Sequence, residues 1–166
     1  MTTAHPLFSI MLILSLLGPG AALAEKPSDG HALEGVTSGK VAWDINVGNP
    51  RTLLVYLRVI EETYADLKRQ GVEPDMIFTF RGPSVRLVSA ERTDVALDEE
   101  AVYDEIAEQI KALLSKPNMR MEVCSIATRL NGVDNQSLLP GLEPVGNTFV
   151  SQIGYQSKGY ASIPIM

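Results

Sequence analysis

Cys124 is the only cysteine in the chain, and it sits in the run "MRMEVCSIATRLNGVD" between a strand-like and a helix-like segment. The thiolate is the nucleophilic form of cysteine, and a helix N-terminus stabilises it and lowers the thiol pKa from about 8.5. The helix-like segment begins at Ser125 or Ile126, so the backbone amides of these residues are placed to stabilise a thiolate at Cys124. The sequence therefore makes Cys124 a candidate nucleophile.

The charged residues near Cys124 act in both directions. Arg120 and Arg129 would favour the thiolate, and Glu122 would oppose it. Because alternate residues of a strand share a face, Cys124 is expected on the face of Arg120 and Glu122, pointing away from the driest side of the strand. The alternative, a buried cysteine that packs as a small apolar residue, remains open.

A second candidate is the run Arg81-Gly82-Pro83, which follows another strand-like segment. It could bring an arginine and free backbone amides beside the Cys124 loop, where an anionic sulfur species would be stabilised. The alternative is an ordinary tight turn with a solvated arginine.

Composition excludes several kinds of chemistry. Beyond residue 24 the chain has Cys124 and one histidine, His31, so a zinc site of clustered Cys and His is excluded and no metal is expected. The sequence has no GxGxxG and no GxxxxGK[ST] motif, so no nucleotide cofactor is expected. A net charge of −6 disfavours binding to nucleic acid.

The N-terminus has the pattern of a secretory signal peptide over residues 1–24. An apolar run from Leu7 to Leu17 precedes a Gly-Pro-Gly break and an Ala-Leu-Ala cleavage site that ends at Ala24. A hydrocarbon core of about 30 Å needs roughly 20 apolar residues, so the pattern predicts no stable membrane anchor after cleavage. We expect a periplasmic or secreted protein.

The remaining chain predicts a flexible lead-in over residues 25–39 and one α/β domain over residues 40–166. Strands are expected near 40–47, 74–80, 119–123, 141–146 and 160–165, and helices near 50–70, 97–115, 125–130 and 148–157. This alternation predicts a three-layer α/β/α fold with a mostly parallel sheet of about five strands. Ligands in such folds bind at the carboxyl ends of the strands, which is where Cys124 lies.

The segment from Val123 to Ala161 resembles the DsrE-like family of sulfur-relay proteins, in particular its small exported members. The resemblance extends over about Val41 to Ile165. The matching residues are Arg58, Gly82-Pro83, Cys124, Gly132-Val133, Leu138-Leu139-Pro140, Val145, Gln156 and Gly159-Tyr160.

This resemblance implies a compact three-layer domain that assembles into oligomers and a cysteine that carries sulfane sulfur as a persulfide. Cys124 would be that residue, with Arg81, Gly82, Ser125, Ile126 and Arg129 as residues that stabilise the thiolate or an incoming anion. A single thiol needs a second molecule to complete a cycle of exchange. The expected partners are a thiol or persulfide protein or a small sulfur donor, and a second copy of the chain.

The rival interpretation is a non-catalytic binding or assembly module with the same fold. Its subunits would associate through surfaces that include Trp43, Tyr155 and Tyr160, and Cys124 would be structural.

Overall fold

The computed structural model describes Met1, residues 26–92 and residues 95–166. The predicted signal peptide lies outside the described residues apart from Met1. The elements, in chain order, are α1 (Gly30–Leu33), β1 (Ser38–Ile45), α2 (Pro50–Arg69), β2 (Glu73–Phe80), α3 (Ser84–Leu87), α4 (Glu100–Leu114), β3 (Met119–Cys124), α5 (Ser125–Asn131), the 3-10 helix η1 (Asn135–Ser137), β4 (Glu143–Val145), α6 (Thr148–Ser157) and β5 (Ala161–Ile165).

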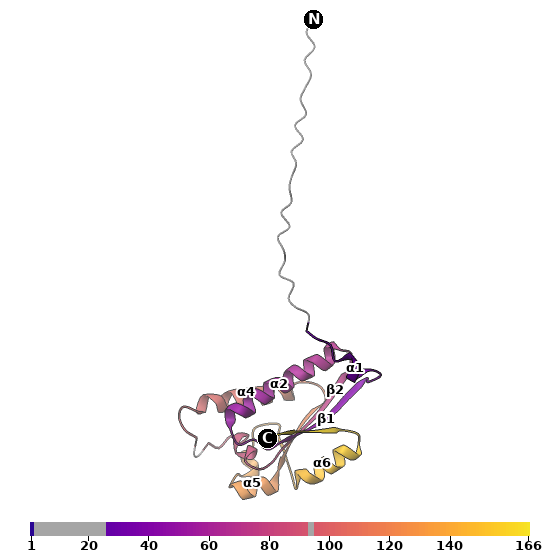
Figure 1. Ribbon diagram of the computed structural model, residues 1–166. Coiled ribbons are helices and arrows are strands. Elements are labelled where there is room, and N and C mark those ends of the chain that lie inside the picture. Colours follow the sequence, from indigo (N-terminus) through magenta and orange to yellow (C-terminus); the bar gives the residue numbers. More distant parts are fainter. Residues whose placement is uncertain (2–25, 93–94) are drawn as a thin grey trace.

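The five strands form one parallel sheet in the order β4-β3-β2-β1-β5. The predicted α/β class with helices on both faces is confirmed: α2 and α4 lie on one side of the sheet and α6 on the other (Figure 1). β5 is an edge strand, which accommodates Pro164 because proline has no N–H to donate to a second neighbour. All carboxyl ends of the strands therefore meet at one edge.

The larger core lies between the sheet and the helices α2 and α4. Asn49 caps α2 by accepting a hydrogen bond from the Thr52 N–H, and Pro50 occupies the first turn, as the sequence predicts. Apolar side chains at helical spacing then face apolar side chains of the three central strands. The largest fully buried side chains of this core are Leu53, Leu57, Ile60, Ile106, Ile110, Leu113, Ile45, Met76, Phe78, Phe80 and Met121.

The opposite face of the sheet is packed differently. Here α6 buries Thr148, Gln152 and Tyr155, whereas the apolar residues Phe149, Val150 and Ile153 of α6 are 58%, 65% and 66% exposed. The apolar part of this contact is a small cluster of Ala42, Ile77 and Tyr155, with Tyr160 packed against it. α6 thus turns its polar side chains inward and its apolar side chains outward.

Several boundaries differ from the predicted ones. α4 begins at Glu100 rather than residue 97, and the segment after β2 forms the four-residue helix α3 and continues to Ser89, which bridges to Leu138. β1 begins at Ser38, two residues before the predicted start. These ends depend on contacts with distant segments, which local sequence patterns do not report.

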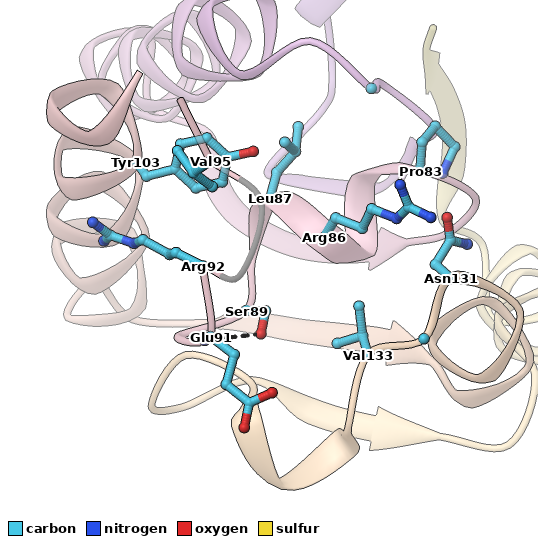
Figure 2. A pocket seen from close by; sticks show the side chains of 12 residues that line it. Pro83, Arg86, Leu87, Ser89, Glu91, Arg92, Val95, Tyr103, Asn131 and Val133 are labelled. Carbon is cyan, nitrogen blue, oxygen red and sulfur yellow. Dashed lines mark hydrogen bonds between the residues drawn. The ribbon is translucent and has the colours of Figure 1, made fainter. Parts of the chain in front are cut away.

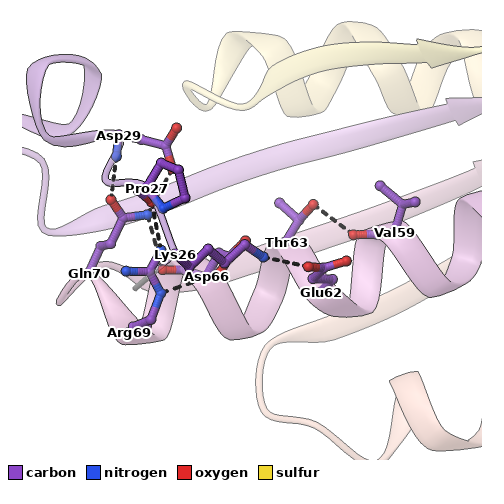
Figure 3. Close-up of polar contacts among 9 residues, drawn as sticks. All are labelled: Lys26, Pro27, Asp29, Val59, Glu62, Thr63, Asp66, Arg69 and Gln70. Carbon is purple, nitrogen blue, oxygen red and sulfur yellow. Dashed lines mark hydrogen bonds and ion pairs between the residues drawn. The ribbon is translucent and has the colours of Figure 1, made fainter. Parts of the chain in front are cut away.

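The predicted flexible lead-in is also different in the structure, because its described part lies against α2 (Figure 3). Lys26 forms ion pairs with Glu62 and Asp66, and the Asp29 N–H donates to the Gln70 side chain at 2.6 Å. The partners lie about 40 positions away along the chain, so a composition rich in Gly, Ser, Pro and charge could not reveal them.

Trp43 and Tyr155 are 6% and 9% exposed. They cannot supply the assembly surface that the rival interpretation gives them, since their side chains are already buried within one chain. No helix in residues 26–92 or 95–166 combines the length and the apolar character needed to span a membrane.

Candidate thiolate site

Cys124 ends β3 at the carboxyl edge of the sheet, beside Val145 of β4. The residue is 6% exposed and lines a pocket of about 230 Å³. The side chains of Ile126, Leu130 and Phe149 line the same pocket and are 39%, 72% and 58% exposed. The sulfur is therefore buried at the base of a small pocket with a largely apolar mouth.

Two helices begin next to the sulfur. Cys124 is the N-cap residue of α5. Its side chain makes no capping hydrogen bond, but the backbone N–H groups of Ile126 and Ala127 lie close enough to lower the pKa of the thiol. The N–H of Thr148, the first residue of α6, does the same. The side chain of Asn147 accepts a hydrogen bond from Phe149 N–H, which leaves the Thr148 N–H to the sulfur. Both helices thus direct backbone donors at one atom.

The Thr148 hydroxyl is a further donor beside the sulfur. The residue is 1% exposed, and its oxygen has no hydrogen-bond partner among the described residues. A buried hydroxyl without a partner costs free energy. A thiolate or a persulfide anion at Cys124 would accept this hydrogen bond and remove the cost.

The electrostatic balance at the sulfur favours the anion. Burial raises the pKa of the Cys124 thiol, but the N–H groups of Thr148, Ala127 and Ile126 and the Thr148 hydroxyl outweigh it, and the pKa is lower than its usual value. A lowered thiol pKa makes more thiolate at neutral pH. The geometry can therefore support nucleophilic chemistry at sulfur.

Arg81 and Gly82 line the Cys124 pocket. The Arg81 guanidinium forms two hydrogen bonds to Asp44, at 2.6 and 2.8 Å, and stands 5.4 Å from the centre of the Phe149 ring. The hydrogen bonds to the Asp44 carboxylate raise the pKa of Arg81 above its usual value, and burial only partly offsets this. Arg81 thus reaches the site as half of an ion pair rather than as a free cation.

Gly82 is held in the left-handed region with φ of 56°. A Cβ at this position would stand 2.0 Å from Oδ1 of Asn46, so the turn has no space for a larger residue. The glycine allows the loop after β2 to pack closely on the loop after β1.

The other candidate residues lie on α5. Ile126 contributes its N–H to the sulfur and its side chain to the pocket. Ser125 instead accepts a hydrogen bond from Asn135 at 3.0 Å, which ties α5 to η1. Arg129 is exposed in the last turn of α5 and is not among the residues that line the pocket.

The sequence did not reveal that the face of β3 with Glu122 is covered. Cys124 and Glu122 do share a face, but Glu122 is 7% exposed and accepts a hydrogen bond from the Tyr155 hydroxyl of α6. Cys124 does point away from the driest side of β3, where Met121 and Val123 are fully buried, but its own face is covered as well, because hydrogen bonding to a tyrosine lets a carboxylate be buried.

Thr148, Asn147 and Phe149 were missed as residues of the site. The sequence places all three just after the fourth strand, at the same edge as Cys124. Knowledge that β4 pairs with β3 would have brought them to the sulfur, but strand order could not be read from the sequence.

A larger cavity of about 510 Å³ lies near the site (Figure 2). It is lined by side chains that include Arg86, Arg92 and Tyr103, and it shares Asn131 with the smaller pocket. Asn131 donates to the Gly82 carbonyl at 3.3 Å. Cys124 does not line this cavity. We therefore assign the chemistry of Cys124 to the smaller pocket, although that pocket has less volume.

His31 is exposed in α1, which precedes the amino end of β1, whereas Cys124 lies at the carboxyl edge of the sheet (Figure 1). The structure therefore does not bring His31 to Cys124. In the part of the chain that the structure describes, no three His, Cys, Asp or Glu side chains are grouped so as to hold a metal ion.

Comparison with known proteins places the fold. No family model matches the chain. An uncharacterized protein of Aquifex aeolicus (strain VF5) is 25% identical over 125 residues, a match that spans 75% of this chain but only 55% of that relative's length. Two solved structures each have a TM-score of 0.56 and cover 76% of this chain and 99% of their own.

These structures are MTH1491 from Methanobacterium thermoautotrophicum, a protein of unknown function, with 18% sequence identity, and YchN from E. coli, with 13%. YchN has a DsrE-like fold, and the similarity covers about three quarters of this chain. The chain therefore has a DsrE-like α/β fold.

The role of Thr148 is testable with Thr148→Val, which removes the hydroxyl but keeps the backbone N–H and the side-chain shape. Loss of a hydrogen bond to the thiolate raises the thiol pKa. The pH at which the alkylation rate reaches half its maximum should therefore rise. The rate with iodoacetamide at pH 7 should fall roughly 3- to 10-fold, as expected for about 1 kcal/mol. At a pH where the sulfur is protonated, the melting temperature should stay the same or rise, because a buried hydroxyl without a partner is removed. A wild-type pH profile would contradict this role.

Proposed function

We propose that this protein handles sulfane sulfur, with Cys124 as a thiolate that becomes a persulfide and passes the sulfur to a partner thiol. The observation that carries the proposal is the convergence of three backbone N–H groups and the unpartnered Thr148 hydroxyl on one sulfur. A merely structural cysteine has no need of so many donors. The DsrE-like fold supports the proposal as an analogy only, because fold does not fix function.

The proposed transfer is two displacements at sulfur with no net oxidation. The Cys124 thiolate attacks the sulfane sulfur of a donor such as thiosulfate, a new S–S bond forms, and the old S–S bond breaks with its electron pair leaving on sulfite. The thiolate of a partner then attacks the terminal sulfur of the Cys124 persulfide, and the Cys124 thiolate leaves. The donors around Cys124 stabilise the anion in both steps.

A sulfur-loading experiment tests the proposal. After incubation with thiosulfate or polysulfide, intact-mass measurement should show a gain of one sulfur atom that dithiothreitol removes, and peptide mapping should place it on Cys124. Cys124→Ser should gain nothing while it keeps its melting temperature. If wild-type protein with a freely alkylated thiol gains no sulfur from either donor, the proposed function is wrong.

We also propose that the chain self-associates through α6. The sequence of α6, "TFVSQIGYQS", has no charged residue and exposes Phe149, Val150 and Ile153. Copies of a chain with a net charge of −6 repel one another, so contact is most favourable over such an uncharged apolar surface.

Ile153→Lys should therefore reduce the mass of the particle measured by light scattering, because it places a charge in the contact. Val55→Lys is the matched control, since Val55 is 58% exposed on α2, on the other side of the sheet. A monomeric wild-type protein, or equal effects of the two changes, would contradict self-association through α6.

Export remains part of the proposal because residues 1–24 have the pattern of a signal peptide. Expression of the full chain in a Gram-negative bacterium should yield a periplasmic protein whose N-terminal residue is Glu25. Deletion of residues 2–24 should retain the protein in the cytoplasm. Recovery of an uncleaved chain from the cytoplasm would contradict export.

A further inference from the structure

The position of α6 decides whether Thr148 reaches Cys124, and this position is set mainly by hydrogen bonds. α6 exposes its apolar residues, and Tyr155 is its one side chain in the small apolar cluster on this face of the sheet. A helix held in this way lacks the broad apolar stripe that usually fixes a helix on a sheet. Its buried polar contacts therefore have an unusually large share in its placement.

Thr148, Gln152 and Tyr155 follow one another at spacings of four and three residues, so they share one side of α6. Each contacts the sheet at a different point. Thr148 faces Cys124, and the Gln152 side-chain amide donates to the Thr79 hydroxyl at 2.8 Å. The Tyr155 hydroxyl donates to the Glu122 carboxylate.

The points of contact on the sheet are adjacent. Thr79 of β2 and Glu122 of β3 are register partners, and Cys124 lies two residues beyond Glu122 on the same face, about 7 Å away. The Thr79 hydroxyl in turn donates to the Trp43 carbonyl of β1 at 3.2 Å. One hydrogen bond from α6 thus reaches β2 and the other reaches β3. Together they fix the position of α6 along β3, the strand that carries Cys124.

We propose that Tyr155 and Gln152 are positioning residues, which hold the first turn of α6 against the Cys124 sulfur through their hydrogen bonds to Glu122 and Thr79. This inference rests on the proposed role of Cys124 as a thiolate. Neither residue touches the sulfur in the contacts described above, so each acts through Thr148.

The chemistry of the contacts suits a permanent role. Burial and the hydrogen bond to Glu122 raise the pKa of Tyr155 to about 12, so its hydroxyl remains a donor throughout the physiological range. Gln152 does not titrate. The contacts therefore hold α6 in the same place when Cys124 gains or loses its proton.

Charged groups near the sulfur also change the pKa of the thiol. Their effect must be separated from that of the position of α6. Glu122 lies on β3, Arg81 and Asp44 form an ion pair at the ends of β2 and β1, and Arg129 is exposed on α5. α6 has no charged residue. Glu122 and Arg120, both on β3, are the charged groups that also act on the Tyr155 hydroxyl.

The experiment measures the rate of Cys124 alkylation by iodoacetamide against pH in four variants. Tyr155→Phe and Gln152→Met each remove one contact of α6. Glu122→Gln keeps an oxygen that accepts from Tyr155 but removes the charge. Tyr64→Phe is the matched control, because it removes a half-buried tyrosine hydroxyl from α2, on the other side of the sheet.

We expect Tyr155→Phe and Gln152→Met each to slow alkylation at pH 7 by about threefold or more and to move the midpoint to higher pH. Glu122→Gln should leave the rate unchanged or increase it, and Tyr64→Phe should have no effect. Gln152→Met tests the proposal even if Tyr155→Phe fails to fold.

The proposal is overturned if folded Gln152→Met has the wild-type pH profile. It is also overturned if Tyr155→Phe alone slows the reaction, because the effect would then come from the Glu122 charge. Iodoacetamide carries no sulfane sulfur, so the result does not depend on sulfur transfer. Failure to form a persulfide would contradict the proposed function and leave the positioning of α6 intact.

Discussion

The contact between α6 and the sheet is the constraint on which the candidate site depends. Cys124 would in any case end β3 and cap α5, since both follow from the local chain. The second set of donors comes from α6, which follows β4 and crosses the sheet to β5. Buried hydrogen bonds of Gln152 and Tyr155, rather than a broad apolar contact, keep the start of α6 at the sulfur.

Most of the architecture could be predicted from the sequence. The Asn49 cap with Pro50, the apolar periodicity of α2 and α4, and the short strands between helices are local signals, and they gave the α/β class correctly. Cys124 at the carboxyl end of a strand also followed from local patterns. The contacts of Lys26 and Asp29 with α2 could not be predicted from local patterns, because their partners lie far away along the chain.

The candidate site was only partly predictable for the same reason. Alternation along β3 correctly placed Cys124 and Glu122 on one face, but it could not show that α6 covers this face and that Tyr155 donates to one oxygen of the carboxylate. Arg81 was expected as a cation for the site, and the structure pairs it with Asp44. Strand order, which brings Thr148 to the sulfur, is a property of the whole sheet.

The central claim is that the folded protein stabilises the Cys124 thiolate, and a titration tests it most directly. The ultraviolet absorbance of the thiolate, followed against pH in the native protein and in denaturant with Cys124→Ser as the blank, gives the two pKa values of this single thiol. The account predicts a lower pKa in the native protein than in the unfolded chain. A native pKa equal to or above the unfolded value would contradict it, since burial would then outweigh the donors of α5 and α6.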